Sequence, residues 1–144
     1  MRKKICTSAA LVSLGLGLWA LGSAVDAQKT KGKTRLAETK SMMKGVIRPN
    51  CAAVGGLVKD AGPTDDKAWD KVALHAVVLN EMSYVVMDDG RCPDKEWAAA
   101  AKTLRECSAK LLECAKAKDV AGAQGAFKGL TGACAACHKA HKAK

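Results

Sequence analysis

Residues 95–116 read KEWAAAAKTLRECSAKLLECAK, and this stretch decides the fold class. Its apolar residues recur at alternating steps of three and four, which places them on one face of an α-helix. Asp94, directly before the stretch, belongs to the residue types that cap helix N-termini. The stretch therefore predicts an amphipathic helix that must bury one face against other elements. Its inward residues are Trp97, Ala100, Leu104, Cys107, Leu111 and Cys114.

Residues 35–59 show the same periodicity and predict the first helix of the chain. Leu36, Met43, Asn50 and Leu57 recur every seven positions along it. Pro49 lies inside this stretch, and a proline in a helix interior removes a hydrogen bond and clashes with the preceding turn. We therefore expect Pro49 to kink this helix or to split it in two.

Residues 65–87 and 120–141 complete a set of four helices. Thr64 or Asp65 is placed to cap the former, and Asp119 to cap the latter. The connections between the four helices are short, which makes sequential helices antiparallel neighbours. The sequence thus predicts an all-α fold, an antiparallel up-down four-helix bundle. The inward rows of these two helices are Val72, Leu79 and Val86, and Ala123, Phe127, Leu130, Cys134 and Cys137.

Composition narrows the function. The 144 residues carry a formal net charge of +10, and aromatic residues make up only 3%. A basic surface with so few aromatic side chains does not favour nucleic-acid binding, but it attracts acidic protein partners or anionic membranes. No nucleophile–base pair and no phosphate-binding loop can be recognised, so we do not expect an enzyme.

Cys134-Ala135-Ala136-Cys137-His138 spells C-x-x-C-H near the end of the last predicted helix. This spacing lets two thiols add to the two vinyl groups of a haem while the next histidine binds the iron. Other interpretations are half of a zinc site, a redox-active C-x-x-C pair, or a chance occurrence. The motif therefore predicts one covalent haem c, with Cys134 and Cys137 as thioether links and His138 as the proximal iron ligand.

The first 27 residues favour the haem interpretation over the others. Residues 1–4 are basic, residues 5–21 are mostly apolar, and Val25-Asp26-Ala27 suits a signal peptidase. We expect a secretory signal peptide over residues 1–27; cleavage after Ala24 and an uncleaved membrane anchor are the alternatives. Export matters because bacteria attach haem to C-x-x-C-H outside the cytoplasmic membrane, so a periplasmic location is predicted.

The remaining chain divides into two parts. Residues 28–34, Gln-Lys-Thr-Lys-Gly-Lys-Thr, are expected to form a flexible basic tail. Residues 35–144 are expected to form one haem-binding four-helix bundle. Residues 28–144 keep a net charge of +8, because the leader contains three basic residues and one acidic residue.

With these features the chain resembles the class II cytochromes c, the cytochrome c′ group, over essentially its whole length after the leader. The resemblance rests on Met43-Lys44, Trp97, the motif from Cys134 to His138, and His141-Lys142. It departs from the family at Thr39, where members often carry an arginine. The residues available to contact the haem propionates instead are Arg35, Lys40 and Arg48.

The resemblance implies two functions that differ at the distal face of the haem. Met43 holds the position that low-spin members use as distal ligand, which implies a periplasmic electron-transfer cytochrome with redox partner proteins. Met82, Met42 and an open or water-bound site are the alternatives to Met43. An open site implies a five-coordinate protein that binds small gases such as NO or CO. The family resemblance also implies a homodimer. If the chain carries no haem, the remaining interpretation is a metal-binding or structural helical module.

The other histidines and cysteines have simpler expected roles. His75 is expected to be a hydrogen-bonded core or seam residue, and His141 to face the helix exterior or a propionate. Cys107 and Cys114 lie about 10 Å apart along one helix, too far for a disulfide. Cys92, at the start of that helix, lies roughly 20 Å or more from either. A bridge within one chain must therefore use Cys51, and a bridge between two chains is the alternative. Otherwise Cys107 and Cys114 serve as small buried apolar residues.

Overall fold

The computed structural model describes residues 31–141. The regular elements in this range are α2 (Thr39–Met42), the π-helical segment η1 (Met43–Ile47), α3 (Arg48–Val58), α4 (Asp66–Val85), α5 (Lys95–Ala117) and α6 (Val120–His141). An isolated bridge between Lys31 and Glu38 is the only β pairing among the described residues. The all-α class is therefore confirmed. The predicted signal peptide and residues 28–30 lie outside the described range.

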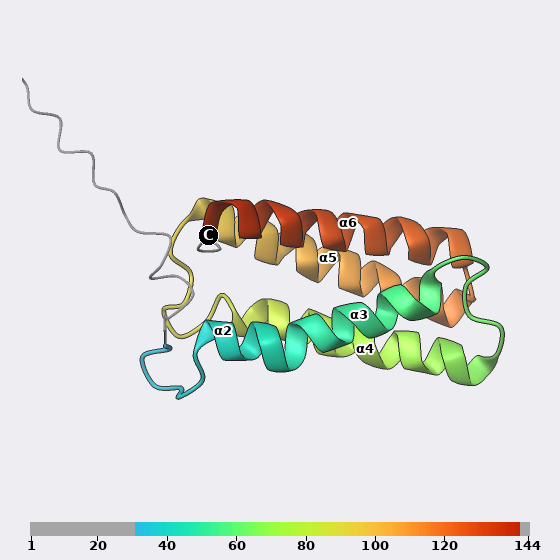
Figure 1. The fold of residues 1–144 in the computed structure, drawn as a ribbon, viewed down its shortest axis with the longest axis horizontal. Helices are drawn as coiled ribbons and strands as arrows, with labels where there is room; N and C mark the ends of the chain where they lie inside the picture. Colours follow the sequence, from blue (N-terminus) through green and yellow to red (C-terminus); the bar gives the residue numbers. More distant parts are fainter. Residues whose placement is uncertain (1–30, 142–144) are drawn as a thin grey trace, which may run out of the picture.

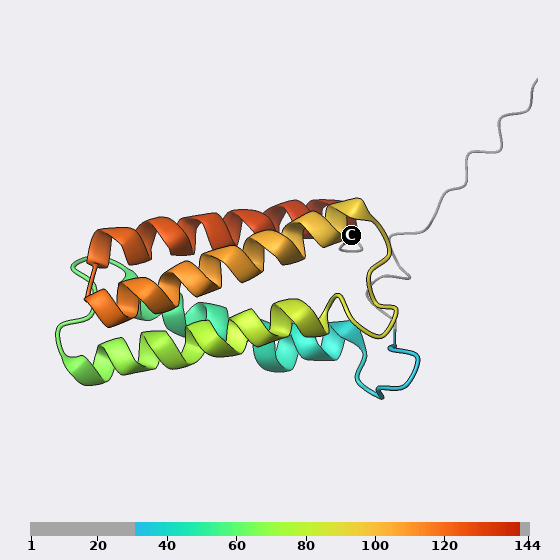
Figure 2. The same cartoon turned by 180° about the vertical axis from the view of Figure 1, so that it is seen from behind.

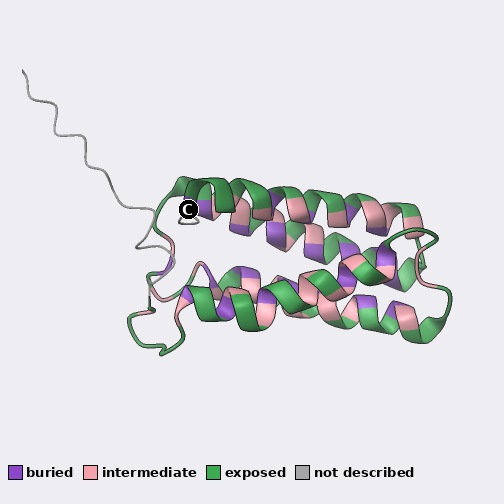
Figure 3. Ribbon diagram, viewed as in Figure 1, coloured by how far each residue is buried: buried purple, intermediate pink, exposed green. Residues whose placement is uncertain are grey.

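The helices run along one common long axis. In Figures 1 and 2, α2, η1 and α3 follow one another in a line beside α4, and α5 lies beside α6. Contacts join α3 to α4, α4 to α5, α5 to α6, and α6 back to α3. Figure 3 shows the buried residues on the sides of the helices that face one another. No helix within residues 31–141 combines the length and apolarity needed to cross a membrane.

The core follows the predicted apolar rows of the three later helices, but not the row predicted for residues 35–59. None of Leu36, Met43, Asn50 and Leu57 is buried; that stretch instead buries Met42, Ile47, Val54 and Val58. The fully covered members of the core come from all four helical stretches; they include Val54, Val72, Ala76, Leu79, Leu111, Ala123 and Leu130, each 0% exposed. Trp97 is 4% exposed, and its Nε1 donates a hydrogen bond to the carbonyl of Val86 over 2.8 Å. The indole therefore closes one end of the core without leaving a buried donor unpaired.

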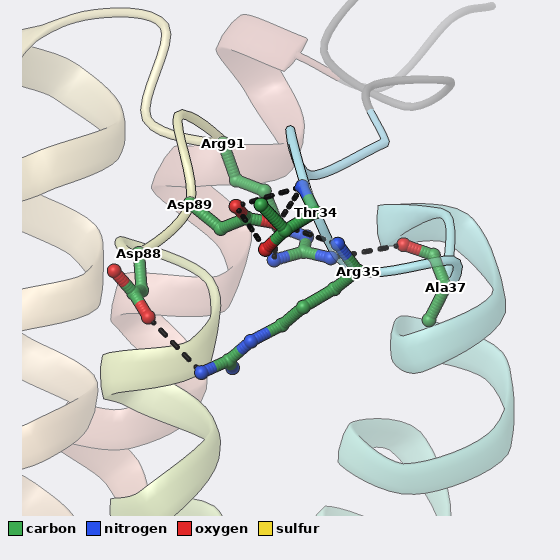
Figure 4. Close-up of polar contacts among 6 residues, drawn as sticks. All are labelled: Thr34, Arg35, Ala37, Asp88, Asp89 and Arg91. Atoms are coloured by element: carbon green, nitrogen blue, oxygen red, sulfur yellow. Dashed lines mark hydrogen bonds and ion pairs between the residues drawn. The ribbon is translucent and has the colours of Figure 1, made fainter.

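The first helical stretch begins at Thr39, not at Arg35 as expected. The Asp89 carboxylate accepts hydrogen bonds from the backbone N–H groups of Thr34 and Arg35, each at 3.0 Å, and from the Thr34 hydroxyl (Figure 4). These bonds hold the chain in a non-helical course. Leu36 is consequently 92% exposed and does not join the predicted apolar row. The flexibility expected of the basic tail stays a prediction.

The division predicted at Pro49 is a change of helix type from π to α and not a break or a kink in the first helical stretch. Pro49 is the second residue of α3, and because the helical course continues from η1, its missing N–H removes one hydrogen bond from a continuous helix. The turn before it, Met43–Ile47, is widened into a π-helix. Helical dihedral angles continue across both joins, at Met43 and at Arg48, so the segments stay in line.

Aspartate side chains begin the three long helices, as predicted. Oδ1 of Asp65 accepts the N–H of Ala68 at 2.7 Å, which makes Asp65 and not Thr64 the cap of α4. Asp94 and Asp119 make the same bond at the starts of α5 and α6, both at 2.9 Å. Helix α5 ends one residue beyond its predicted bound, α6 has its predicted bounds, and α4 ends two residues early at Val85.

Candidate functional site

The C-x-x-C-H motif lies on the last turns of α6. Residues three and four apart share one side of a helix, so Cys134, Cys137 and His138 point to neighbouring directions. Cys134 and Cys137 are half-buried and pack against the core, whereas His138 is exposed. The two thiols thus face the interior of the helix assembly, and the imidazole lies at its edge.

Two contacts fix how far α6 is shifted along α3. Nε2 of Gln124 donates hydrogen bonds to the carbonyls of Val58 and Asp60 over 3.0 and 2.9 Å. One turn further along, Gly55 faces Phe127: a Cβ on Gly55 would lie 2.7 Å from the phenyl Cζ. The glycine therefore permits a close approach that a larger residue would prevent.

The contact between α3 and α6 also brings a third thiol to the motif. Cys51 lies one turn before Gly55, and Cys134 lies two turns beyond Phe127. The thiols of Cys51 and Cys134 are hydrogen-bonded to each other, and both side chains pack against the same core. The spacing of the C-x-x-C-H motif does not indicate that Cys51 belongs to this site.

The thiols of the cluster differ in acidity. The hydrogen bond with Cys134 lowers the pKa of Cys51 to about 7, against a smaller opposing effect of burial. The same bond, together with burial, raises the pKa of Cys134. Burial also raises the pKa of Cys137, and the negative charge of Asp94 adds to it. Cys134 and Cys137 therefore keep their protons at neutral pH, and Cys51 is the thiol of this cluster that ionises most readily.

Met43, the predicted distal ligand, lies at the first position of η1. Its side chain is half-buried and packs against the core, whereas its neighbour Met42 is 7% exposed. Within the described residues, η1 contacts α2, α3 and α4 but not α6. The structure therefore does not bring the backbone at Met43 against the helix that carries His138. Ligation by Met43 stays a prediction.

The exterior position expected of His141 is wrong, because its side chain is buried; the alternative contact with a propionate stays a prediction. The residue is 7% exposed, and its ring meets that of Trp97 edge-on, with centroids 5.4 Å apart. Its Nε2 lies 3.3 Å from Oδ1 of Asp94. At the start of α5, Trp97 provides an apolar ring and Asp94 a carboxylate for this histidine. The spacing of residues along α6 cannot predict these contacts, because they come from another helix.

His75 behaves as predicted. Its Nδ1 lies 2.7 Å from Oδ1 of Asn50, across the seam between α4 and α3. Asn50 in turn donates from Nδ2 to the carbonyl of Val46 at 2.8 Å. The histidine is therefore a partly buried seam residue that joins two helices by a hydrogen bond.

The other described cysteines are free thiols, and two of them fill the predicted apolar role. Cys114 is 2% exposed, and Cys107 packs against the core. Burial raises the pKa of both. The Sγ of Cys92 donates a hydrogen bond to the carbonyl of Asp94 over 3.3 Å.

Comparison of the chain with protein family models, curated proteins and solved structures finds no match. Within residues 31–141, no three His, Cys, Asp or Glu side chains gather as a ligand set for a metal ion. The porphyrin ring itself provides four nitrogen ligands to a haem iron, so a haem site needs only one or two iron ligands from the protein.

Proposed function

We propose that the chain is a periplasmic c-type cytochrome with one covalent haem that transfers electrons, built as an antiparallel up-down four-helix bundle. The observation that carries the proposal is the C-x-x-C-H motif on the last turns of α6, with both thiols turned to the core and protonated. In this proposal Cys134 and Cys137 hold the haem as thioethers, and His138 holds the iron. The resemblance to class II cytochromes c supports the same assignment.

The course of the helices supports this site. α6 contacts α3 but not η1, so the first helical stretch and α6 separate toward the end that carries Cys137 and His138. A flat ring held between helices needs such a separation. When bound, the haem supplies an iron that exchanges one electron. The chain's part is to fix the ring through two thiols, to orient the His138 imidazole, and to exclude water with the apolar core.

Surface charge supports an acidic redox partner. Basic side chains are exposed on the first helical stretch and on the last turns of α6; they are Lys40, Lys44, Arg48 and Lys139. Opposite charges on two partners raise the rate of encounter, and salt screens that effect. Electron transfer needs no bond to a substrate, in keeping with the proposal that the chain is not an enzyme.

Intact mass measurement tests the proposal. The full chain is expressed in a bacterium that attaches haem to exported C-x-x-C-H proteins, and the denatured product is weighed. We expect an added mass of about 616 Da, the mass of one haem. The double variant Cys134→Ala, Cys137→Ala should lack it, and the matched double variant Cys107→Ala, Cys114→Ala should keep it. A wild-type chain without added mass would contradict the proposal.

A second function, reversible binding of small gases to a five-coordinate haem, is favoured by one observation. Met43 packs against the apolar core, as a methionine does when it fills space and binds no metal. The absorption spectrum of the reduced protein separates the two functions. A low-spin spectrum that carbon monoxide leaves unchanged supports electron transfer, and a high-spin spectrum that shifts supports gas binding.

A homodimer is part of the proposal and is supported by α4. Leu74, Val77 and Tyr84 are 61%, 42% and 49% exposed. Their spacing of three and seven residues places them on one face of the helix. Light scattering during gel filtration should give twice the monomer mass for the wild type and the monomer mass for Val77→Lys. A monomeric wild type would contradict this part.

A further inference from the structure

The contact between Cys51 and Cys134 has a chemical consequence. The Gln124 bonds and the Gly55–Phe127 contact set the register of α3 against α6, and this register places the two thiols within hydrogen-bond reach. Both are half-buried and lie against the same core, which limits their side-chain freedom. Two thiols held in this way are a pair that oxidation can join.

We propose that Cys51 and Cys134 form an intramolecular disulfide in the chain before haem is attached, and that this bond withholds Cys134 from the haem. The first half concerns the chain alone. The second half rests on the proposed function, in which Cys134 becomes a thioether. Cys51 then acts as a redox gate on maturation: the bond must be reduced before attachment can proceed.

The oxidation balances with a small disulfide, such as oxidised glutathione, as the oxidant. The Cys51 thiolate attacks one sulfur of the oxidant, forms a mixed disulfide and releases one small thiolate. The Cys134 sulfur, losing its proton, then attacks the Cys51 sulfur and expels the second small thiolate. The protein loses two electrons and two protons, and the oxidant becomes two thiols. Reduction by a dithiol reverses both steps.

Haem attachment has a different requirement. The S–H of Cys134 must add across a vinyl double bond, with sulfur joining one carbon and hydrogen the other, and no net oxidation occurs. A disulfide has no S–H to add. The bond to Cys51 therefore blocks attachment at Cys134 while leaving Cys137 and His138 in place.

The pKa values of the two thiols agree with Cys51 attacking the oxidant first and Cys134 reacting second. An attacking thiol works best when its pKa is near the ambient pH, and the pKa of Cys51 is about 7. The remaining cysteines are less suited. The Sγ of Cys107 and of Cys114 lie toward α6 at Gly129 and Gly122, away from the Cys51 pair. Within the motif, the pair Cys134 and Cys137 is the competing bridge.

Disulfide mapping tests the first half. The full chain, made without haem supply, is oxidised with glutathione disulfide under native conditions and digested with trypsin without reduction. We expect residues 45–59, which contain Cys51, to be joined to residues 129–139, which contain both motif cysteines. Cys137→Ala should keep this link and Cys134→Ala should lose it; the same oxidation in urea, as a reference, should scatter links over Cys92, Cys107 and Cys114. An oxidised 129–139 peptide without the cross-link would overturn the proposal.

Haem attachment tests the second half. The fraction of chain with added haem mass is followed as the thiol reductant is lowered, for wild type, Cys51→Ala and the matched variant Cys107→Ala. Cys51→Ala should reach half-attachment at a reductant level at least about threefold lower than the other two. Equal requirements in all three would overturn the gate. No haem in any variant at any reductant level would instead refute the proposed function, and the cross-link would still stand or fall by itself.

Discussion

His141 lies edge-on against Trp97, with ring centroids 5.4 Å apart and ring planes at 74°. The contact joins the last residue of α6 to the first turn of α5, three residues after the proposed iron ligand. Asp94 completes it, because its Oδ1 both caps α5 through the N–H of Trp97 and lies 3.3 Å from the imidazole. The end of α6, and with it His138, is therefore held by α5.

Replacing His141 by alanine should destabilise the protein by about 2 kcal/mol, because a buried ring and an edge-to-face pair are lost together. Urea unfolding followed by circular dichroism measures the change. Lys139→Ala is the matched control: this residue is exposed on the same turn of α6, and its substitution should change stability by less than about 0.5 kcal/mol. Equal midpoints for the two variants would contradict the role of the contact.

Two leucines, one buried in the core and one exposed, should contribute very differently to the free energy of unfolding. Leu130 is 0% exposed and Leu36 is 92% exposed. Leu130→Ala removes buried methyl groups and leaves a cavity, so it should lower the free energy of unfolding by about 3 kcal/mol. Leu36→Ala should change it by less than about 0.5 kcal/mol. A large effect of Leu36→Ala in urea unfolding would mean that Leu36 packs in the apolar row after all.

The helices could be predicted from the sequence because their signals are local. The three-four spacing and the aspartate caps place α5 and α6 to within one residue. The start of the first helical stretch could not be predicted, because it depends on Asp89, which is more than fifty residues away from Thr34. No periodicity along residues 35–59 reports that the N–H groups before Thr39 are already bonded elsewhere.

One part of the candidate site could likewise be predicted from the sequence, and another part could not. The motif itself identifies Cys134, Cys137 and His138 from three positions of one helix. The meeting of Cys51 with Cys134 depends on how far α6 is shifted along α3, and that shift is set by Gln124 and by the close approach at Gly55. Helix periodicity gives the face of each helix but not this axial shift, so sequence reasoning did not pair the two thiols.

Asp89 should make the stability of the protein depend on pH. Burial acts to raise its pKa, but hydrogen bonds from Arg35 and Thr34 and the charge of Arg91 lower it below the ordinary value. A carboxyl with a lowered pKa in the folded state stabilises the protein above its unfolded pKa of about 3.9, and this contribution is lost as the pH falls through the folded value.

Asp89→Asn should therefore be less stable than the wild type at pH 7, and the difference should shrink below about pH 4. Arg91 strengthens the expectation: it is 1% exposed, and its Nη1 lies 3.5 Å from the Asp89 carboxylate. Urea unfolding at pH 7, 4 and 2.5 measures both variants. The control is Asp88→Asn, which removes an exposed ion pair with Arg35 and should have little effect at any pH. A difference that stays constant with pH would rule out the role given to Asp89.

Met43 decides between the two proposed functions, and its neighbour provides the control. If Met43 binds the iron, Met43→Ala should turn a low-spin reduced spectrum into a high-spin one that shifts with carbon monoxide, and the reduction potential should fall because a thioether ligand favours ferrous iron. Met42 is 7% exposed, so Met42→Ala should cost about 2–3 kcal/mol in urea unfolding and leave the spectrum unchanged. Met82→Ala should also leave the spectrum unchanged. A wild-type protein that is already high-spin, with Met43→Ala altering only stability, would make Met43 a core residue and gas binding the better function.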